Sequence, residues 1–124
     1  MKVIDSSGWL EFFLDGPLGS QYAAYLKEPQ QVLTPTTVLY EVYKVIKRDR
    51  TEEEAVVASA QMGKTHVVPL TDDIALTAAD ASLAHHLAMA DAIVYATALT
   101  YQAKVVTSDS DFENLEGVIY LKKS

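Results

Sequence analysis

Short apolar runs alternate with longer amphipathic segments along the whole chain. Five runs have the length of buried strands, and they cover residues 2–4, 31–33, 66–70, 104–107 and 118–120. The longer segments between them carry apolar residues at helical spacing. In the clearest example, residues 36–48, the apolar face comprises Val38, Leu39, Val42, Val45 and Ile46. Strands that alternate with helices favour an α/β fold with a central, mostly parallel, five-stranded sheet flanked by helices.

Side chains that can cap helices precede several of the amphipathic segments. The N-cap candidates are Asp5, Thr34, Thr51, Thr71 and Ser110. Thr34 is followed by Pro35, a residue favoured at the first position of a helix. Thr51 and Ser110 are each followed three residues later by Glu, which is the spacing of a capping box. These signals predict a helix after each candidate, and a further helix is expected from about residue 91 to 101.

The composition is typical of one soluble globular domain over residues 1–124. Hydrophobic residues make up 49% of the chain and charged residues 22%, as in ordinary soluble proteins. Cysteine is absent, which excludes disulfides, thiol nucleophiles and cysteine-ligated zinc. Asp5 comes too early for the apolar segment of a signal peptide, and the longest apolar stretch contains Asp91 and is too short to span a bilayer. We therefore expect a cytoplasmic protein that does not bind membranes.

The chain is acidic, with a formal net charge of −7 at pH 7. Broad, nonspecific adhesion to nucleic acid depends on Lys and Arg side chains that neutralise phosphates, so this charge argues against it. An enzyme that acts on nucleic acid is still compatible, because divalent cations held by clustered carboxylates would offset part of the charge. The one notable basic cluster comprises Lys44, Lys47, Arg48 and Arg50.

Two acidic residues follow predicted strands. Asp5 comes directly after the first strand, and Asp109 lies two residues past the end of the fourth. The carboxyl ends of parallel strands meet at one edge of a sheet, where open α/β sheets build their sites. We therefore expect Asp5 and Asp109 to project from the same edge, although Asp5 could also serve only as a helix cap.

Two further acids lie on predicted helices. Glu41 falls about 100° from the centre of the apolar face of its helix, and its alternative role is a surface pair with Lys44. Asp91 interrupts the apolar segment L-A-M-A-D-A-I-V-Y, and its alternative role is a helix N-cap. Carboxylates gathered in one pocket resist ionising together. A hard divalent cation with oxygen ligands, such as Mg²⁺, would relieve that repulsion.

These acids, in this order and spacing, resemble the signature of the PIN domain family, and in particular of the VapC-type toxins of prokaryotic toxin–antitoxin pairs. The matching positions are Asp5 with Ser7 in I-D-S-S, Glu41 four residues after Thr37, Asp91 in A-D-A-I-V-Y-A-T-A, and Asp109 in T-S-D-S-D-F. The likeness extends from residue 3 to about residue 120, and its last two motifs are the most specific. It implies a PIN-like three-layer fold.

The resemblance also implies an activity and a set of partners. The family's members are ribonucleases that depend on Mg²⁺ or Mn²⁺ and hydrolyse RNA phosphodiester bonds with metal-activated water. Asp5, Glu41, Asp91 and Asp109 match the acidic quartet that holds the metal, and Ser7, Thr107 and Asp111 match positions that support the site. The implied assembly is a homodimer, held inactive by a cognate antitoxin with a basic inhibitory segment.

The basic cluster suggests where RNA would be held. Lys44 and Arg48 share the side of the helix that carries Glu41, so they are expected to contact phosphates that flank the cleavage point. Their alternative role is that of a plain solvated helix face. Histidine has no predicted part in the chemistry, because His85 and His86 point about 100° apart on a helix and cannot form an acid–base pair.

Three other classes of function are alternatives to a nuclease. A non-catalytic binding module would use the acidic pocket to capture a basic side chain of a partner, although such a module would readily lose an acid and its repulsion. A phospho-acceptor receiver would need a Lys after a late strand, whereas Lys104 precedes its strand. A haloacid-dehalogenase-like phosphatase would need a second Asp at the position of Ser7.

Overall fold

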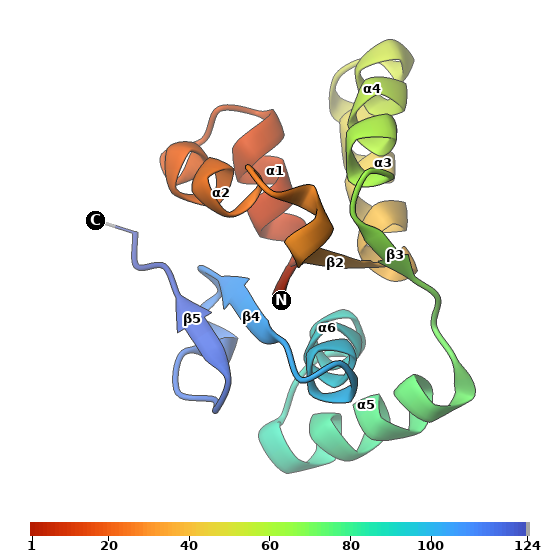
Figure 1. Cartoon of the computed structure of the whole chain (residues 1–124), viewed down its shortest axis with the longest axis vertical. Coiled ribbons are helices and arrows are strands. Elements are labelled where there is room, and N and C mark those ends of the chain that lie inside the picture. Colours follow the sequence, from red (N-terminus) through yellow and green to blue (C-terminus); the bar gives the residue numbers. More distant parts are fainter. Residues whose placement is uncertain (124) are drawn as a thin grey trace.

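The computed structural model describes residues 1–123 and contains a five-stranded sheet with helices packed on it (Figure 1). The strands are β1 (Lys2–Ile4), β2 (Val32–Pro35), β3 (His66–Val68), β4 (Lys104–Thr107) and β5 (Val118–Tyr120). The helices are α1 (Ser6–Phe13), α2 (Gly19–Tyr25), α3 (Thr36–Asp49), α4 (Glu52–Met62), α5 (Asp72–His85) and α6 (Met89–Thr100). Two 3₁₀ turns, η1 (Pro29–Gln31) and η2 (Ser110–Phe112), precede β2 and β5.

All pairings between neighbouring strands are parallel, and the order across the sheet is β3-β2-β1-β4-β5. The register sets Val3 opposite both Leu33 and Val105. After β1 the chain adds β2 and β3 on one side of the sheet, and after β4 it adds β5 on the other side. The topological switch point therefore lies between β1 and β4. In open α/β sheets, ligands bind in the crevice at the carboxyl ends of the strands at this point. The predicted α/β fold with a mostly parallel sheet is confirmed.

Helices cover both faces of the sheet, which gives the predicted three layers. In Figure 1, α1 to α4 lie above the sheet and α5 and α6 lie below it. Below, α6 contacts β1, β2 and β4, and α5 packs on α6. Above, α1 contacts β4 and α3 contacts β2, while α2 packs on α1 and α4 packs on α3. Within residues 1–123, every helix is too short or too polar to cross a lipid bilayer.

The central strands and α6 form the core. Val3, Ile4, Val105 and Val106 have no exposed surface, and burying a side chain of this kind contributes at most about 1.5–3 kcal/mol. Residues 92–98 of α6 are all buried as well, because this helix lies between the sheet and α5. A helix that is apolar all round is one that is buried all round. An acid at the start of such a helix, Asp91, therefore needs a specific role.

Three of the predicted helix caps are confirmed: Asp5 caps α1, Thr51 caps α4 and Thr71 caps α5. Thr51 Oγ1 accepts a hydrogen bond from Glu54 N at 3.0 Å, and Thr71 Oγ1 accepts one from Ile74 N at 3.2 Å. Each bond satisfies an N–H group of the first helical turn that has no partner within the helix. For this reason α4 and α5 begin where the sequence predicts.

The prediction that Thr34 caps α3 is wrong. Thr34 lies inside β2 and is fully buried, and its hydroxyl forms a 2.6 Å hydrogen bond with the hydroxyl of Thr65. Pro35 takes the N-cap position instead, without a side-chain hydrogen bond. A buried hydroxyl requires a partner, and here the partner comes from the loop before β3.

The helix predicted to begin at Ser110 is wrong in its cap and its length. Asp109 is the capping residue, and the element is only the single turn η2. The start predicted for α6 is also shifted, because this helix begins at Met89 with Ala88 as its N-cap. Asp91 thus lies in the first turn of α6, and the alternative role of N-cap does not apply to it.

Candidate active site

Asp5 is buried at the carboxyl end of β1, with 4% of its surface exposed, and it caps α1. Its Oδ1 accepts a hydrogen bond from Gly8 N at 3.0 Å, and its Oδ2 accepts bonds from Ser7 Oγ at 3.0 Å and Thr107 Oγ1 at 2.6 Å. Burial raises the pKa of Asp5, and the three hydrogen bonds oppose that rise. Since Thr107 ends β4, Asp5 joins the two strands at the switch point.

A chain of hydrogen bonds continues from Asp5 into the turn after β4. Thr107 Oγ1 accepts a bond from Asp109 N at 3.0 Å, and Asp109 Oδ1 accepts one from Asp111 N at 2.9 Å. Local side-chain bonds of this kind fix the conformation of a turn. The backbone that carries Asp109 and Asp111 is therefore positioned by Thr107, and through it by Asp5.

Asp91 brings a third carboxyl group to this place from α6. One carboxylate oxygen from each of Asp91, Asp109 and Asp111 lies within 4.8 Å of the other two, and we call these three residues the carboxylate triad. The pKa of Asp91 is raised to about 6, first by burial and then by repulsion from Asp109, Asp5, Asp111 and Glu41. Asp91 is thus within electrostatic reach of every other acid of the predicted quartet.

Glu41 approaches the triad from α3 and is half-buried. Burial raises its pKa, the positive charge of Lys44 opposes the rise, and the negative charge of Asp5 adds to it. Among residues 1–123 the ion pairs within 4.0 Å do not include one between Glu41 and Lys44. The geometry therefore favours a place beside the acidic group over a surface ion pair.

The two expected contacts for RNA phosphates are exposed on α3. Arg48 forms a bidentate pair with Asp49, with Nε to Oδ1 at 2.7 Å and Nη2 to Oδ2 at 3.0 Å. Exposed pairs of this type contribute little, so the guanidinium can exchange Asp49 for a phosphate. Lys44 Nζ lies 4.9 Å from the centroid of the Tyr40 ring.

The donor atoms of the triad suit a divalent cation. They are carboxylate oxygens, the ligands that Mg²⁺ and Mn²⁺ prefer, and the charges that raise the pKa of Asp91 are all negative. His85 and His86 are exposed at the C-terminal end of α5, and neither belongs to the carboxylate triad. The residues present therefore fit the metal that the quartet implies.

Asp111 and Asp5 have surroundings in the structure that differ from those expected from the sequence. Asp111, expected only as support, contributes an oxygen to the carboxylate triad. Asp5, expected as a ligand, already accepts three hydrogen bonds from the protein. Asp111 is therefore a further candidate ligand, and the hydrogen bonds of Asp5 tie it to α1 and β4; the set of residues that contacts a cation stays a prediction.

Three residues that support the site were not predicted: Gly8, Tyr22 and Ser108. Tyr22 is fully buried on α2, and its hydroxyl donates to Ser108 Oγ at 3.2 Å, directly beside Thr107 in the sequence. Burial raises the pKa of Tyr22 to about 12, so the hydroxyl keeps its proton. Gly8 makes room for the ring, because a Cβ there would lie 2.4 Å from Tyr22 Cε1. A contact across 86 residues leaves no local signal in the sequence.

Comparison with known proteins agrees with this geometry. The family model of the PIN domain matches residues 2–118. A chain of a toxin–antitoxin complex from Klebsiella pneumoniae is similar at a TM-score of 0.84 and 21% identity, over 99% of this chain and 100% of that one. VapC20 of Mycobacterium tuberculosis, described as a toxin that cleaves the sarcin–ricin loop, is similar at a TM-score of 0.81 and 19% identity, with 99% and 100% covered.

A more distant likeness is to FitAcB from Neisseria gonorrhoeae, with a TM-score of 0.74 and 16% identity over 98% of this chain and 97% of that one. At such identities the likeness shows a shared fold. A comparison with curated protein sequences gives no match. The family model, in contrast, covers nearly the whole chain, from the first residue of β1 to the start of β5. On this match, together with the shared fold, the chain belongs to the PIN domain family.

Proposed function

We propose that this protein is a metal-dependent endoribonuclease that acts in the cytoplasm as the toxin of a VapBC-type toxin–antitoxin pair. The observation that carries the proposal is the convergence of Asp91, Asp109 and Asp111 at the switch point of the sheet, with Asp5 and Glu41 beside them. Membership of the PIN domain family and the likeness to a VapC-type fold support it.

In this proposal the residues of the site have distinct roles. The carboxylate triad holds Mg²⁺ or Mn²⁺, and Glu41 completes the shell or positions the attacking water. When bound, the divalent cation supplies the positive charge that acidifies water and neutralises the scissile phosphate. Asp5 accepts from the Thr107 hydroxyl, which in turn accepts from the N–H of Asp109, so Asp5 presets the geometry of the triad.

RNA cleavage with and without divalent cation tests the proposal. We expect a single-stranded RNA to be cut in Mg²⁺ or Mn²⁺, to stay intact in EDTA, and to be cut again when the ion is returned. The same ions should raise Tm, because a ligand that binds only the folded state stabilises it by about 2.7 kcal/mol at 100 times its Kd. Na⁺ at matched ionic strength is the control for both measurements.

The outcomes of this test separate the candidate functions. Cleavage that persists in EDTA would contradict metal dependence. Stabilisation by Mg²⁺ without cleavage of any RNA would favour the alternative, a non-catalytic module whose acidic pocket captures a basic side chain. The raised pKa of Asp91 is the observation that makes this alternative physically reasonable, since any cation would relieve the repulsion.

An antitoxin is the first partner in the proposal. Similar folds occur in a toxin–antitoxin complex from Klebsiella pneumoniae and in DNA-bound VapBC from Salmonella typhimurium, the latter with a TM-score of 0.76 at 16% identity over 98% of this chain and 96% of that one. The net charge of −7 and the clustered carboxylates favour a partner with a basic segment.

We expect the inhibitory segment of the antitoxin to place an Arg or Lys against the carboxylate triad. Removing one partner of a buried charge pair typically costs about 2–5 kcal/mol, so replacing that basic residue by Ala should weaken the complex by an amount of this order. Calorimetric titration with a series of antitoxin variants measures the effect. A complex that tolerates charge reversal at every Arg and Lys of the partner would contradict the expectation.

The second partner in the proposal is another copy of the same chain, which would form a homodimer. On α5, Leu76 and Leu83 are 68% and 81% exposed and lie seven residues apart, which places them on one face of the helix. Met89, at the start of α6, is 78% exposed. Large apolar side chains exposed together mark contact surfaces, so this face of α5 and α6 is where a second copy is expected to pack.

A further inference from the structure

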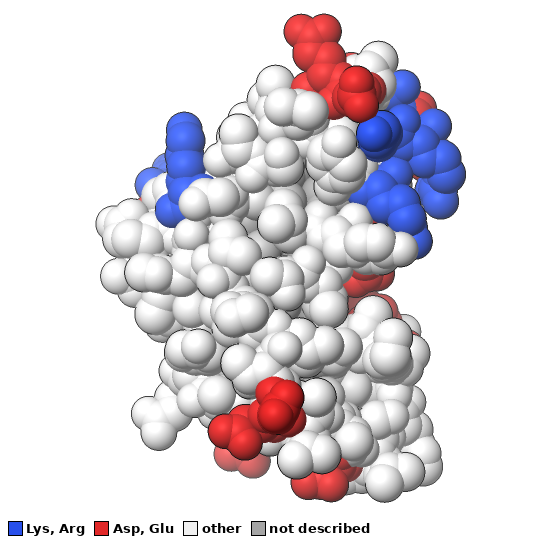
Figure 2. Space-filling model, turned by 90° about the vertical axis from the view of Figure 1, so that its right-hand side faces the viewer, with Lys and Arg blue, Asp and Glu red and all other residues white. Residues whose placement is uncertain are grey.

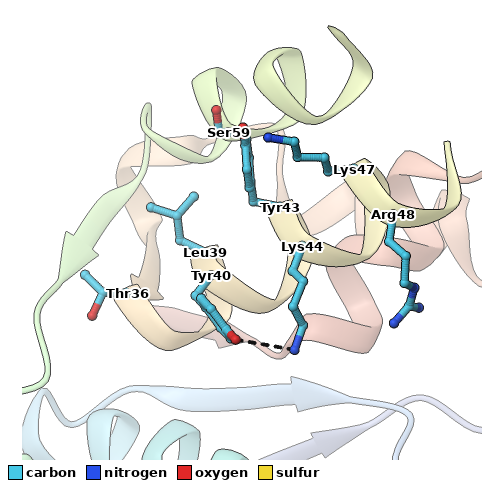
Figure 3. A pocket seen from close by; sticks show the side chains of 8 residues that line it. All are labelled: Thr36, Leu39, Tyr40, Tyr43, Lys44, Lys47, Arg48 and Ser59. Atoms are coloured by element: carbon cyan, nitrogen blue, oxygen red, sulfur yellow. Dashed lines mark hydrogen bonds between the residues drawn. The ribbon is translucent and has the colours of Figure 1, made fainter. Parts of the chain in front are cut away.

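A groove of about 800 Å³ lies against the outer side of α3, and we call it the α3 groove. Three apolar or aromatic residues and three basic residues make most of its wall: Leu39, Tyr40, Tyr43, Lys44, Lys47 and Arg48 (Figure 3). In Figure 3, Tyr40, Lys44 and Arg48 project from the side of α3 that faces away from α4. The groove therefore combines aromatic rings with positive charge.

The aromatic and basic side chains of the groove contact one another. Lys44 Nζ lies 4.9 Å from the centroid of the Tyr40 ring and 3.5 Å from its hydroxyl, and Lys47 Nζ lies 5.5 Å from the centroid of the Tyr43 ring. Lys47 also pairs with Glu52 at 3.0 Å. Lys44 forms no ion pair within 4.0 Å in the described part of the chain. Tyr40 is 61% exposed, so its ring is accessible from solvent.

The α3 groove adjoins the acidic site. Glu41 follows Tyr40 on α3, and the charge of Lys44 is close enough to act on the carboxyl group of Glu41. Tyr40, Lys44 and Arg48 are four residues apart, so they are spaced by about 6 Å along the helix. A polymer that reaches Glu41 would therefore meet these three side chains in succession.

The charges of the molecule favour an anionic occupant. Four of the ten Lys and Arg residues of this acidic chain lie between residues 44 and 50. Figure 2 shows a group of basic side chains at one edge of the molecule, with acidic side chains in a notch just below it. A polyanion that also carries flat rings fits both the charge and the exposed tyrosine, because any base can stack on an aromatic side chain.

We propose that single-stranded RNA extends from the acidic site into the α3 groove, with one base stacked on Tyr40 and flanking phosphates held by Lys44 and Arg48. This inference rests on the proposed ribonuclease function and names the form of its substrate. Lys44 exchanges the Tyr40 ring for a phosphate, which costs little because the contact is exposed. Duplex RNA, whose bases are stacked on each other, cannot use Tyr40 in this way.

Binding can be measured apart from cleavage. The probe is a fluorescent 12-nucleotide single strand, about the length of one binding site, titrated in EDTA with the Asp91→Asn protein so that cleavage cannot interfere. Tyr40→Ala in that background should weaken binding about tenfold, and Tyr40→Trp should preserve it. Lys44→Gln should lower the slope of log affinity against log salt by about 0.7. Tyr101→Ala, which removes another exposed tyrosine at the C-cap of α6, is the control and should bind as before.

Each outcome bears on the inference. Equal affinity of Tyr40→Ala and Tyr101→Ala for the single strand would overturn it. Equal affinity of the protein with Tyr40 in place for the single strand and for a duplex of the same length would also overturn it. A Tyr40→Ala variant that is a monomer where the native protein is a dimer would assign the groove to a second copy of the chain instead. Binding that depends on Tyr40 without cleavage by the native protein in Mg²⁺ would support the groove while contradicting the nuclease.

Discussion

Asn in place of Asp91 is expected to abolish metal-dependent RNA cleavage while stabilising the metal-free fold. Asp91 supplies one of three carboxylate oxygens that lie within 4.8 Å of one another. Mutation of residues that only support metal ligands typically costs about 10–100-fold, so the loss of a direct ligand should reduce cleavage by more than about 100-fold. Initial rates on a single-stranded RNA in excess Mg²⁺ measure this loss.

The gain in stability follows from the pKa of Asp91. Its rise from 3.8 to about 6 would correspond to about 3 kcal/mol for a fully buried group, and solvent screening of this half-exposed carboxyl reduces the expected gain to about 1–2 kcal/mol. The folded state retains a proton that the unfolded chain releases between about pH 4 and pH 6. The metal-free native protein should therefore lose stability as pH rises through that window, and the Asp91→Asn protein should lose less.

The matched control is Glu28→Gln, which removes an exposed carboxyl in the segment before η1 and should leave both cleavage and unfolding unchanged. Urea unfolding without metal at pH 4 and pH 7 compares the three proteins. Native cleavage rates in the Asp91→Asn protein would remove the carboxylate triad from the mechanism. A variant less stable than the native protein at pH 7 would show that the cluster is not electrostatically strained.

Asp5 shows why two acids of one predicted quartet must be treated differently. In the sequence, Asp5 and Asp91 are both acids next to apolar segments, and replacing either by Asn removes one charge. In the structure, both oxygens of Asp5 accept hydrogen bonds, from Ser7, Gly8 and Thr107. An amide at this position would turn one acceptor into a donor, so relief of charge is offset by lost bonds.

The features that the sequence predicts are those set by local rules. The approximate positions of the strands, the apolar stripe of α3 and the caps Thr51 and Thr71 depend on neighbours within a few residues, although β2 extends to Pro35 and β3 ends at Val68 rather than at residues 33 and 70. The placement of Asp5 and Asp109 needs one further rule, that parallel strands end at a common edge. The prediction of that edge succeeded because β1 and β4 are adjacent, with Val3 paired to Val105.

The features that the sequence does not predict depend on partners far along the chain. From the sequence, Thr34 is predicted to be a helix cap. In the structure its hydroxyl forms a hydrogen bond with Thr65, which lies 31 residues away. In the sequence, Tyr22 looks like an ordinary residue on the apolar face of a helix. In the structure its hydroxyl donates a hydrogen bond to Ser108. The oxygen of Asp111 joins the carboxylate triad only because a turn of three residues, η2, replaces the predicted helix. Tertiary contacts, which no local pattern encodes, decide these positions.

Ala in place of Gly8 is expected to destabilise the fold strongly. The new Cβ would lie 2.4 Å from Tyr22 Cε1 and 2.7 Å from Ile4 Cγ2, and both neighbours are fully buried. Overpacking of a core typically costs about 1–3 kcal/mol, which exceeds the gain of about 1 kcal/mol from replacing Gly by Ala in a helix. With contacts this short the cost should reach the upper end of that range, and Tm should fall by about 10 °C.

The same substitution should weaken metal binding, because Gly8 N donates to Asp5 Oδ1 and Tyr22 holds Ser108 beside the triad. Gly63→Ala is the control, since its nearest neighbours are helix carbonyls at 3.4 Å and its backbone is ordinary right-handed helix; it should be neutral or slightly stabilising. A second change, Tyr22→Leu, should recover part of the loss, because the two side chains compete for one space and their effects cannot add. Two results would show that Gly8 and Tyr22 do not share that space: a Tm of Gly8→Ala equal to that of the native protein, or a loss of stability in the double variant equal to the sum of the two single losses. Either result would also mean that the packing of α1 on α2 does not position the acidic site.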